Sequence, residues 1–194
     1  MVAKNVIVLP YDEQWNYAFV QIKDEIQKAL GSLALRIEHV GSTSVQGLSA
    51  KPIIDIDVVI KDYSVFDAVV TALEGIGYHH EGDLGIAARE VFKYYGKEHL
   101  QKHHLYVCPQ DSAELKRHVA FRNYLRSNTE AVREYSRIKE ESAALYPNDI
   151  EKYIQHKAGM AIIFERYHIY TSLAVAPCFF PCYAISIAYN HYII

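Results

Sequence analysis

Cysteine is scarce in this sequence, and its scarcity excludes one class of protein. The 194 residues include three cysteines, Cys108, Cys178 and Cys182, which are too few and too unevenly spaced for the disulfide framework of a small secreted domain. Histidine is plentiful, with ten residues, but no His-x-His or His-Glu-x-x-His pattern is present. The sequence therefore does not indicate a zinc hydrolase.

An excess of positive charge is also absent. Twenty Lys and Arg stand against 23 Asp and Glu, a formal charge of -3, which disfavours a broad nucleic-acid-binding surface but leaves room for a local basic pocket. Hydrophobic residues make up 51% and charged residues 22%, proportions that disfavour disordered, collagen-like and coiled-coil proteins. The length predicts one domain, or one domain with a small helical appendage.

Export and membrane signals are lacking at both ends of the sequence. The N-terminal segment is short and is followed by acidic, amphipathic sequence, so we expect no signal peptide. Residues 172–194 are apolar and aromatic, but Pro177 and Pro181 interrupt them, whereas a transmembrane helix needs about 20 uninterrupted apolar residues. We expect a cytoplasmic protein with no membrane association. The tail is explained either by packing on the body or on a second copy, hence a homodimer, or by a late change of reading frame.

Hydrophobic patterns of two kinds are present. Apolar residues at steps of three and four predict a helix over residues 12–30, with Asp12 as its N-cap. A second helix is expected after Ser64 and Asp67, which resemble a capping box, and a third after Asp111 and Glu114. Two more helices are predicted over residues 129–145 and 149–170. Short runs suited to β-strands occupy residues 35–40, 53–60, 91–95 and 103–108.

This order of elements predicts an α+β (α/β) fold, a small mixed sheet flanked by helices with a helical subdomain near the C-terminus. We expect the sheet domain in residues 1–110, the helical subdomain packed on it in residues 111–170, and the apolar tail in residues 171–194.

Two acidic residues in the strand predicted over residues 53–60 are candidate metal ligands. Asp55 and Asp57 are one residue apart, so their side chains share a face of the strand and can chelate a hard cation such as Mg²⁺. The alternative is a solvated polar face, which the surrounding Ile and Val disfavour because they predict a buried strand.

A turn rich in small polar residues precedes that strand: Gly41, Ser42, Thr43 and Ser44. Its backbone N–H groups and hydroxyls suit an anionic phosphate. Ser42 alone is equally a turn or N-cap serine, and its spacing from Asp55 is what points to a function.

These residues resemble a known family. Gly-Ser followed after twelve residues by Asp-x-Asp is similar to the signature of the DNA polymerase β-like nucleotidyltransferase superfamily. More closely, residues 39–57 (HVGSTSVQGLSAKPIIDID) resemble the GrpB family within it. The resemblance continues through HHLYVC (103–108), FRNYLR (121–126) and Tyr153 with Lys157, and covers about residues 5–168.

The sequence departs from the family pattern in three respects. Gln46 replaces a usual proline, and Ala88 replaces a usual glycine in GIAARE (85–90), which restricts that loop because only glycine enters positive-φ regions freely. The third carboxylate that transferases of the superfamily supply from a later strand is missing from residues 103–108. His104 is our candidate for its place, as a proton acceptor, and Glu90 is the second choice.

Three basic residues are further candidates for binding phosphate: Lys51, Arg89 and Lys157. Lys51 is equally a loop lysine, Arg89 equally an ion-pair partner within the sheet, and Lys157 is a candidate through its place in the resemblance.

The resemblance implies a Mg²⁺-dependent nucleotidyltransferase, in which Asp55 and Asp57 hold the metal and a nucleoside triphosphate donates a nucleotidyl group to a hydroxyl of a small molecule or protein. Two alternatives stay open: an inactive nucleotide- or metabolite-binding module with the same fold, and a metal-dependent phosphohydrolase. A long nucleic-acid partner is not expected.

Overall fold

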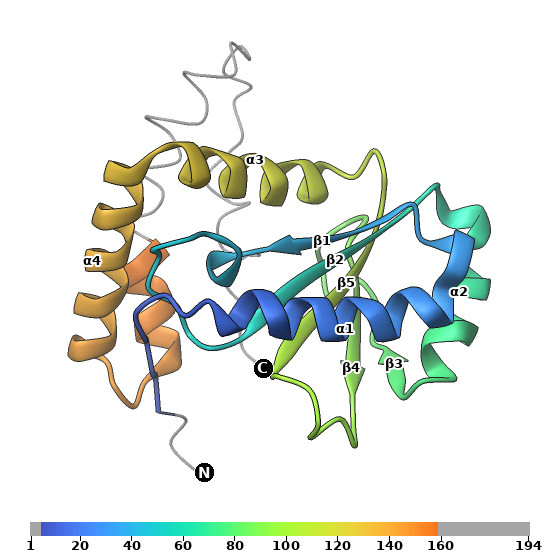
Figure 1. Ribbon diagram of the computed structural model, residues 1–194, viewed down its shortest axis with the longest axis horizontal. Coiled ribbons are helices and arrows are strands. Elements are labelled where there is room, and N and C mark those ends of the chain that lie inside the picture. Colours follow the sequence, from blue (N-terminus) through green and yellow to red (C-terminus); the bar gives the residue numbers. More distant parts are fainter. Residues whose placement is uncertain (1–4, 159–194) are drawn as a thin grey trace.

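The fold is built on one mixed β-sheet, which a computed structural model describes together with its helices for residues 5–158. Its strands are β1 (Arg36–Val40), β2 (Ile54–Ile60), β3 (Tyr78–His80), β4 (Glu90–Tyr94) and β5 (His103–Pro109), in the order β1-β2-β5-β4-β3. The central pair β2 and β5 is parallel, and the other neighbours are antiparallel. The predicted α+β class is thereby confirmed (Figure 1).

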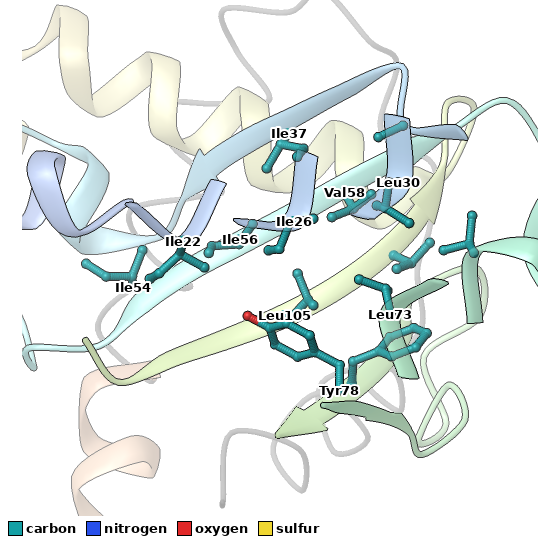
Figure 2. Close-up of a cluster of buried hydrophobic side chains, with 14 of the residues drawn as sticks. Ile22, Ile26, Leu30, Ile37, Ile54, Ile56, Val58, Leu73, Tyr78 and Leu105 are labelled. Carbon is teal, nitrogen blue, oxygen red and sulfur yellow. The ribbon is translucent and has the colours of Figure 1, made fainter. Parts of the chain in front are cut away.

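One face of the sheet, called the core face below, is apolar and packs against α1 (Gln14–Leu30) and α2 (Phe66–Glu74). Every second residue of β2 points into this layer, as expected for a strand with one buried apolar side. Figure 2 shows how α1 and the central strands interlock through Ile22, Ile26, Ile54, Ile56, Val58 and Leu105, all fully enclosed.

The opposite face, called the polar face below, is covered by α3 (Ala113–Ser127), which contacts β1 and β5. The next helix, α4 (Thr129–Leu145), packs on the loop between β1 and β2 through a small apolar cluster that contains Val45, Leu48 and Val132. Residues 150–158 are helical as well and pack through Tyr153 against Val6. The predicted boundary at residue 110 falls in the turn between β5 and α3.

Parts of the predictions for the C-terminal region lie outside the described residues. These are the predicted continuation of the last helix to residue 170 and the apolar tail over residues 171–194. Among residues 5–158, no helix is both long and apolar enough to cross a membrane.

Two of the predicted helix caps are wrong by one or two residues. A short 3-10 turn, η3 (Tyr63–Val65), precedes α2, and its cap is Asp62, whose carboxylate accepts from the Ser64 backbone N–H at 2.8 Å. The third helix is capped by Ser112 rather than Asp111, since the Ser112 hydroxyl accepts from the Leu115 N–H at 3.3 Å. In both places several capping residues stand close together, and the local backbone decides which one serves.

Candidate functional site

The register of the central strands assembles the polar face. Asp55 lies beside His104 and Asp57 beside Tyr106 on the parallel neighbour β5, while Glu38 of β1 lies on the other side of Asp57. Since residues paired across strands share a face, all five side chains project from the sheet toward α3. The two aspartates therefore lie side by side at the centre of this face.

Asp55 is the more accessible of the two carboxylates, with a side chain 24% exposed. The imidazole Nδ1 of His104 lies 2.9 Å from its Oδ1. Burial raises the pKa of Asp55, but the hydrogen bond from His104 and the charges of His104, His118 and Lys51 outweigh burial and lower it overall. Asp55 is thus a carboxylate at neutral pH, as metal binding requires.

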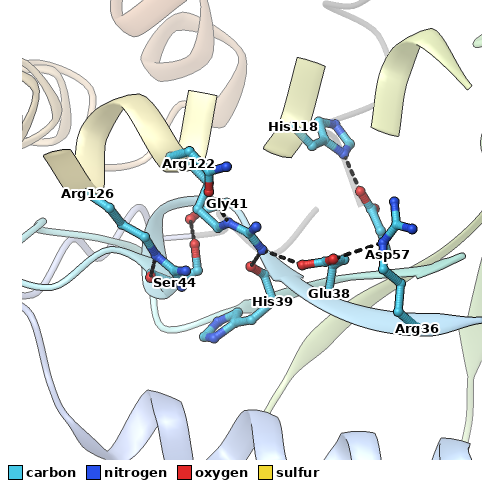
Figure 3. A network of polar contacts seen from close by, with 10 residues as sticks. Arg36, Glu38, His39, Gly41, Ser44, Asp57, His118, Arg122 and Arg126 are labelled. Carbon is cyan, nitrogen blue, oxygen red and sulfur yellow. Dashed lines mark hydrogen bonds and ion pairs between the residues drawn. The ribbon is translucent and has the colours of Figure 1, made fainter. Parts of the chain in front are cut away.

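Asp57 is fully buried and is held from above by α3 (Figure 3). The Nδ1 of His118 donates to its Oδ2 at 2.8 Å, and the Nε2 of His118 lies 3.1 Å from Glu114. Burial lowers the pKa of His118, but the hydrogen bonds and charges of Asp57 and Glu114 raise it to about 9. His118 is therefore an imidazolium beside the buried Asp57 side chain.

The second oxygen of Asp57, Oδ1, is buried and has no hydrogen-bond partner among residues 5–158. A buried carboxylate oxygen without a partner is costly, and such groups occur where a ligand completes the site. Within the same residues, no group of three or more His, Cys, Asp or Glu side chains is placed to hold a metal ion. Two carboxylates alone suit Mg²⁺, which commonly takes its remaining ligands from water and substrate phosphates.

The loop after β1 is shaped around Asp55. Gly41 has φ +67°, and a Cβ atom at this position would overlap the Asp55 carboxylate. It is followed by the 3-10 turn η2 (Ser42–Ser44). The Thr43 hydroxyl donates to the Ile53 carbonyl at 3.2 Å, and the Ser44 hydroxyl donates to the Gly41 carbonyl at 2.6 Å. These two hydroxyls maintain the loop, and the half-buried Ser42 is the one that stands at its open side.

Two arginines of α3 brace this loop from outside, as Figure 3 shows. Arg126 donates through Nε and Nη2 to the Ser44 carbonyl at 3.0 and 2.7 Å. Arg122 donates to the His39 carbonyl at 2.9 Å and to Glu38 at 2.7 Å. The helix thereby fixes the loop relative to the sheet.

Three lysines, called the lysine cluster below, gather near Asp55: Lys51, Lys139 and Lys157. The ammonium groups of Lys51 and Lys157 lie 5.9 and 5.6 Å from the ring centre of Tyr153, whose buried hydroxyl has no hydrogen-bond partner among residues 5–158. Lys139 of α4 is 3% exposed. Burial lowers its pKa, as does the charge of Lys157, while Asp55 raises it.

The other candidates lie apart from this cluster. Arg89 is buried against Tyr106, with its guanidinium 4.6 Å from the ring centre. Glu90 points to the core face, where it accepts from Tyr63 at 2.9 Å and lies 2.7 Å from the His80 imidazole. The second choice for a third carboxylate therefore does not join the aspartates, whereas His104 does.

Sequence reasoning missed His118, Glu114 and Lys139. His118 lies 61 residues from its partner Asp57, so no local pattern links them. Lys139 carried a signal, because it falls on the buried stripe of α4 together with Tyr135, Ile138 and Ser142. A lysine at a core position of an amphipathic helix is a candidate for function.

An open groove of about 1050 Å³ lies next to the loop. It is bounded by α1, the loop and the junction of α3 with α4, and Tyr11, Tyr17 and Arg126 are among its walls. Ser44 of the loop also lines it, but neither aspartate nor any residue of the lysine cluster does.

Several known proteins are similar to this chain in sequence, and some also in fold. Residues 5–166 match the family described as GrpB protein. The crystal structure of GrpB from Enterococcus faecalis is 31% identical, covers 86% of this chain and 99% of its own, and superposes with a TM-score of 0.75. The protein YqkA of Bacillus subtilis is 32% identical over 154 residues, which are 79% of this chain and 44% of YqkA. The chain thus spans less than half of that relative.

A more distant likeness concerns the fold alone. A structure of Cid1, described for its RNA terminal uridylyl transferase activity, is 10% identical, with a TM-score of 0.51 over 90% of this chain and 52% of Cid1. The nucleotidyltransferase-like fold expected from the sequence is confirmed. By its matched residues and its relatives, the chain belongs to the GrpB family.

Proposed function

We propose that the protein is a Mg²⁺-dependent nucleotidyltransferase that moves a nucleotidyl group from a nucleoside triphosphate to a hydroxyl of a small molecule or a protein. One observation carries this proposal: two carboxylates lie on one face of β2, Asp57 has a buried oxygen without a partner among residues 5–158, and Asp55 lies beside both the loop shaped around it and the lysine cluster. Negative groups that take a cation and positive groups that take phosphate are thus complementary halves of one site.

The lysine cluster is suited to the triphosphate. Lys139 is held among other positive charges in a buried position, where its charged form is disfavoured. A triphosphate beside it would supply the missing negative charge and raise the pKa of Lys139. The Tyr153 hydroxyl has no hydrogen-bond partner in residues 5–158, and its ring centre lies 5.9 and 5.6 Å from the ammonium groups of Lys51 and Lys157, so this hydroxyl would donate to a phosphate oxygen bound by the lysines.

Asp55 and Asp57 would hold Mg²⁺, which in such sites neutralises charge on the triphosphate and its leaving group. His104 would act as the general base for the acceptor hydroxyl. Its Nδ1–H donates to Asp55, which leaves Nε2 free to take the proton of the attacking hydroxyl. The hydroxyl oxygen then bonds to the α-phosphorus, the bond from the α-phosphorus to the bridging oxygen breaks, and pyrophosphate leaves.

One observation favours a second candidate, an inactive nucleotide-binding module. Asp57 is enclosed by α3 and paired with an imidazolium, which competes with a metal for that carboxylate. Such a module would bind Mg²⁺ with nucleotide but release no pyrophosphate. A phosphohydrolase would release phosphate or pyrophosphate with water as the acceptor.

The site is tested by calorimetric titration of ATP, GTP, CTP and UTP, each with and without Mg²⁺, and release of pyrophosphate with an acceptor then separates a transferase from an inactive module. The titration compares the wild type, the double variant Asp55→Asn/Asp57→Asn, and the control Asp24→Asn/Asp67→Asn, which changes two exposed aspartates on α1 and α2. We expect Mg²⁺-dependent binding that disappears only in the first variant. Absence of binding to every triphosphate, or binding that survives Asp55→Asn/Asp57→Asn, would contradict the proposal.

A further inference from the structure

Arg89 is the most unusual buried group outside the metal and phosphate site. It is 1% exposed, and its Nε and Nη2 atoms have no hydrogen-bond partner among residues 5–158. Its guanidinium stacks on the ring of Tyr106, a contact that leaves the in-plane N–H donors unused. A buried guanidinium without an anion is expensive, because it loses its hydration and gains no counter-charge.

The position of Arg89 separates it from the lysine cluster. Tyr106, on which it stacks, is the register partner of Asp57, and the ring centres of Tyr106 and His118 are 6.3 Å apart. The pKa of the Cys108 thiol is raised first by burial, then by the charge of Asp57, and is lowered by Arg89. Arg89 therefore lies at the Asp57 end of the polar face, whereas the lysines act on Asp55.

The loop that precedes Arg89 is closed by hydrogen bonds within itself. Its hydrogen bonds are internal, from the Gly85 and Ile86 N–H groups to Asp83 and from the Arg89 N–H to Ile86. Two of its residues that are not glycine, Leu84 and Ala88, have positive φ values of 48° and 58°, a conformation that L-residues rarely adopt and that costs energy. An anionic ligand bound to Arg89 would supply the counter-charge and the hydrogen-bond acceptors that the closed loop does not provide.

We propose that Arg89 binds an oxyanion, a phosphate monoester or a carboxylate, on the acceptor substrate. This inference rests on the proposed function: the triphosphate occupies the lysine cluster, and the acceptor enters from the other end of the carboxylate pair, with its hydroxyl toward His104 and its anionic group on Arg89. The planar fork of an arginine matches both kinds of oxyanion through two parallel hydrogen bonds. The acceptor class is thus a hydroxylated small molecule that carries a negative charge.

The test uses three probes that share a hydroxylated skeleton: glycerol 3-phosphate, glycerate and the neutral control glycerol. Each is titrated into the full chain in the presence of Mg²⁺ and the nucleotide that binds best, and separately into Lys157→Gln, so that the lysine cluster does not compete for the anion. Binding is followed by calorimetry and by the Nε resonances of ¹⁵N-labelled arginine. The variants are Arg89→Gln, Arg89→Lys and the control Arg36→Gln, which changes a half-exposed arginine of β1.

We expect one or both anionic probes to bind the wild type and Arg36→Gln and to shift the Nε signal of Arg89, while glycerol does not bind. Arg89→Gln should weaken binding roughly tenfold to a hundredfold, as expected for the loss of charge-assisted hydrogen bonds, and Arg89→Lys should weaken it less. Which anionic probe binds distinguishes a phosphate from a carboxylate. Equal affinity in Arg89→Gln, or no binding of either anion, would overturn the proposal.

Folding and the proposed function are checked separately. Arg89→Met keeps the volume but removes the unpaired charge, so its melting temperature should equal or exceed that of the wild type; a marked fall would assign Arg89 a structural role and overturn the proposal. Nucleotide binding should be unchanged in Arg89→Gln. If no nucleotide binds while an anion still binds through Arg89, the proposed transferase function fails and the anion site stands without its acceptor role.

Discussion

The two faces of the sheet differ in the polarity of the side chains that they enclose. On the core face the enclosed side chains are nearly all aliphatic or aromatic. On the polar face, among residues 5–158, three side chains are enclosed with atoms that lack a hydrogen-bond partner: Asp57 (Oδ1), His118 (Nε2) and Arg89 (Nε and Nη2). The same strands, β2 and β5, supply both faces through alternate residues.

This difference suggests that the core face stabilises the fold, whereas the polar face is arranged for binding. Burial of apolar area stabilises the core face, whereas the polar face keeps charges in places that cost stability. Such a cost is typical of a site arranged for a ligand. Substitutions on the two faces should therefore have different effects on folding and on binding.

The largest expected effect on stability is Leu105→Ala on the core face. Leu105 is fully enclosed between the strands and α1, so its truncation should lower the free energy of unfolding by about 3 kcal/mol. On the polar face, Asp57→Asn keeps the shape but leaves the buried His118 imidazolium with Glu114 as its remaining acidic partner, so it should cost less than Leu105→Ala, about 1–2 kcal/mol. Urea unfolding of both variants checks the contrast, and similar losses would refute it.

A slightly smaller loss of stability is expected for Gly41→Ala. This residue has φ 67° and ψ -171°, a region almost reserved for glycine, and its new Cβ would overlap the Asp55 carboxylate. We expect a loss of about 2–3 kcal/mol in stability and more than about tenfold weaker binding of Mg²⁺ with nucleotide.

Gly82→Ala is the matched control for that change. Gly82 also has a positive φ, 85°, but a Cβ there would meet nothing within 4 Å. It should therefore lose stability through backbone strain alone and keep nucleotide binding. Loss of binding in both variants would show that strain, and not the contact with Asp55, is responsible.

The core face should also make stability depend on pH. Burial lowers the pKa of His39 and of His103 to about 4, so both are neutral in the folded protein, while the unfolded chain takes up protons below about pH 6.5. The stability they contribute is present above pH 6.5 and is lost as the pH falls toward 4. Between pH 7 and 5 the loss should be about 2 kcal/mol per histidine.

The check is urea unfolding between pH 7 and 5 for the wild type and for His39→Gln/His103→Gln. The double variant should show a shallower dependence on pH in this window. An identical dependence in both proteins would mean that these histidines are not held neutral.

Much of the fold was predictable because its signals are local. The runs of Ile and Val in β2 and the helical spacing of Trp15, Ile22 and Ile26 each appear within a few residues. His104 was placed beside the aspartates from the sequence, through the family resemblance. The pairing of Asp57 with His118 was less accessible, since it depends on the packing of α3 on the sheet. Glu90 could have been excluded as a third carboxylate from the sequence, because it lies two residues from the core residue Phe92 in β4 and therefore on the same face of the sheet.

The smallest effect concerns the helix that covers the polar face. Ser112→Ala removes the hydroxyl that accepts from the Leu115 N–H and should cost about 1 kcal/mol. Ser112→Thr, which keeps a hydroxyl, should restore most of it. Thermal unfolding measures both, and an equal loss in the two variants would show that packing rather than capping matters at this position.

The central claim, that the polar face is a metal and triphosphate site, is tested most directly by crystallography with Mn²⁺ in place of Mg²⁺ and a non-hydrolysable nucleoside triphosphate. We expect an anomalous peak between Asp55 and Asp57, with the triphosphate against Lys51, Lys139 and Lys157. A nucleotide bound elsewhere, or bound here with no peak at the two carboxylates, would contradict it.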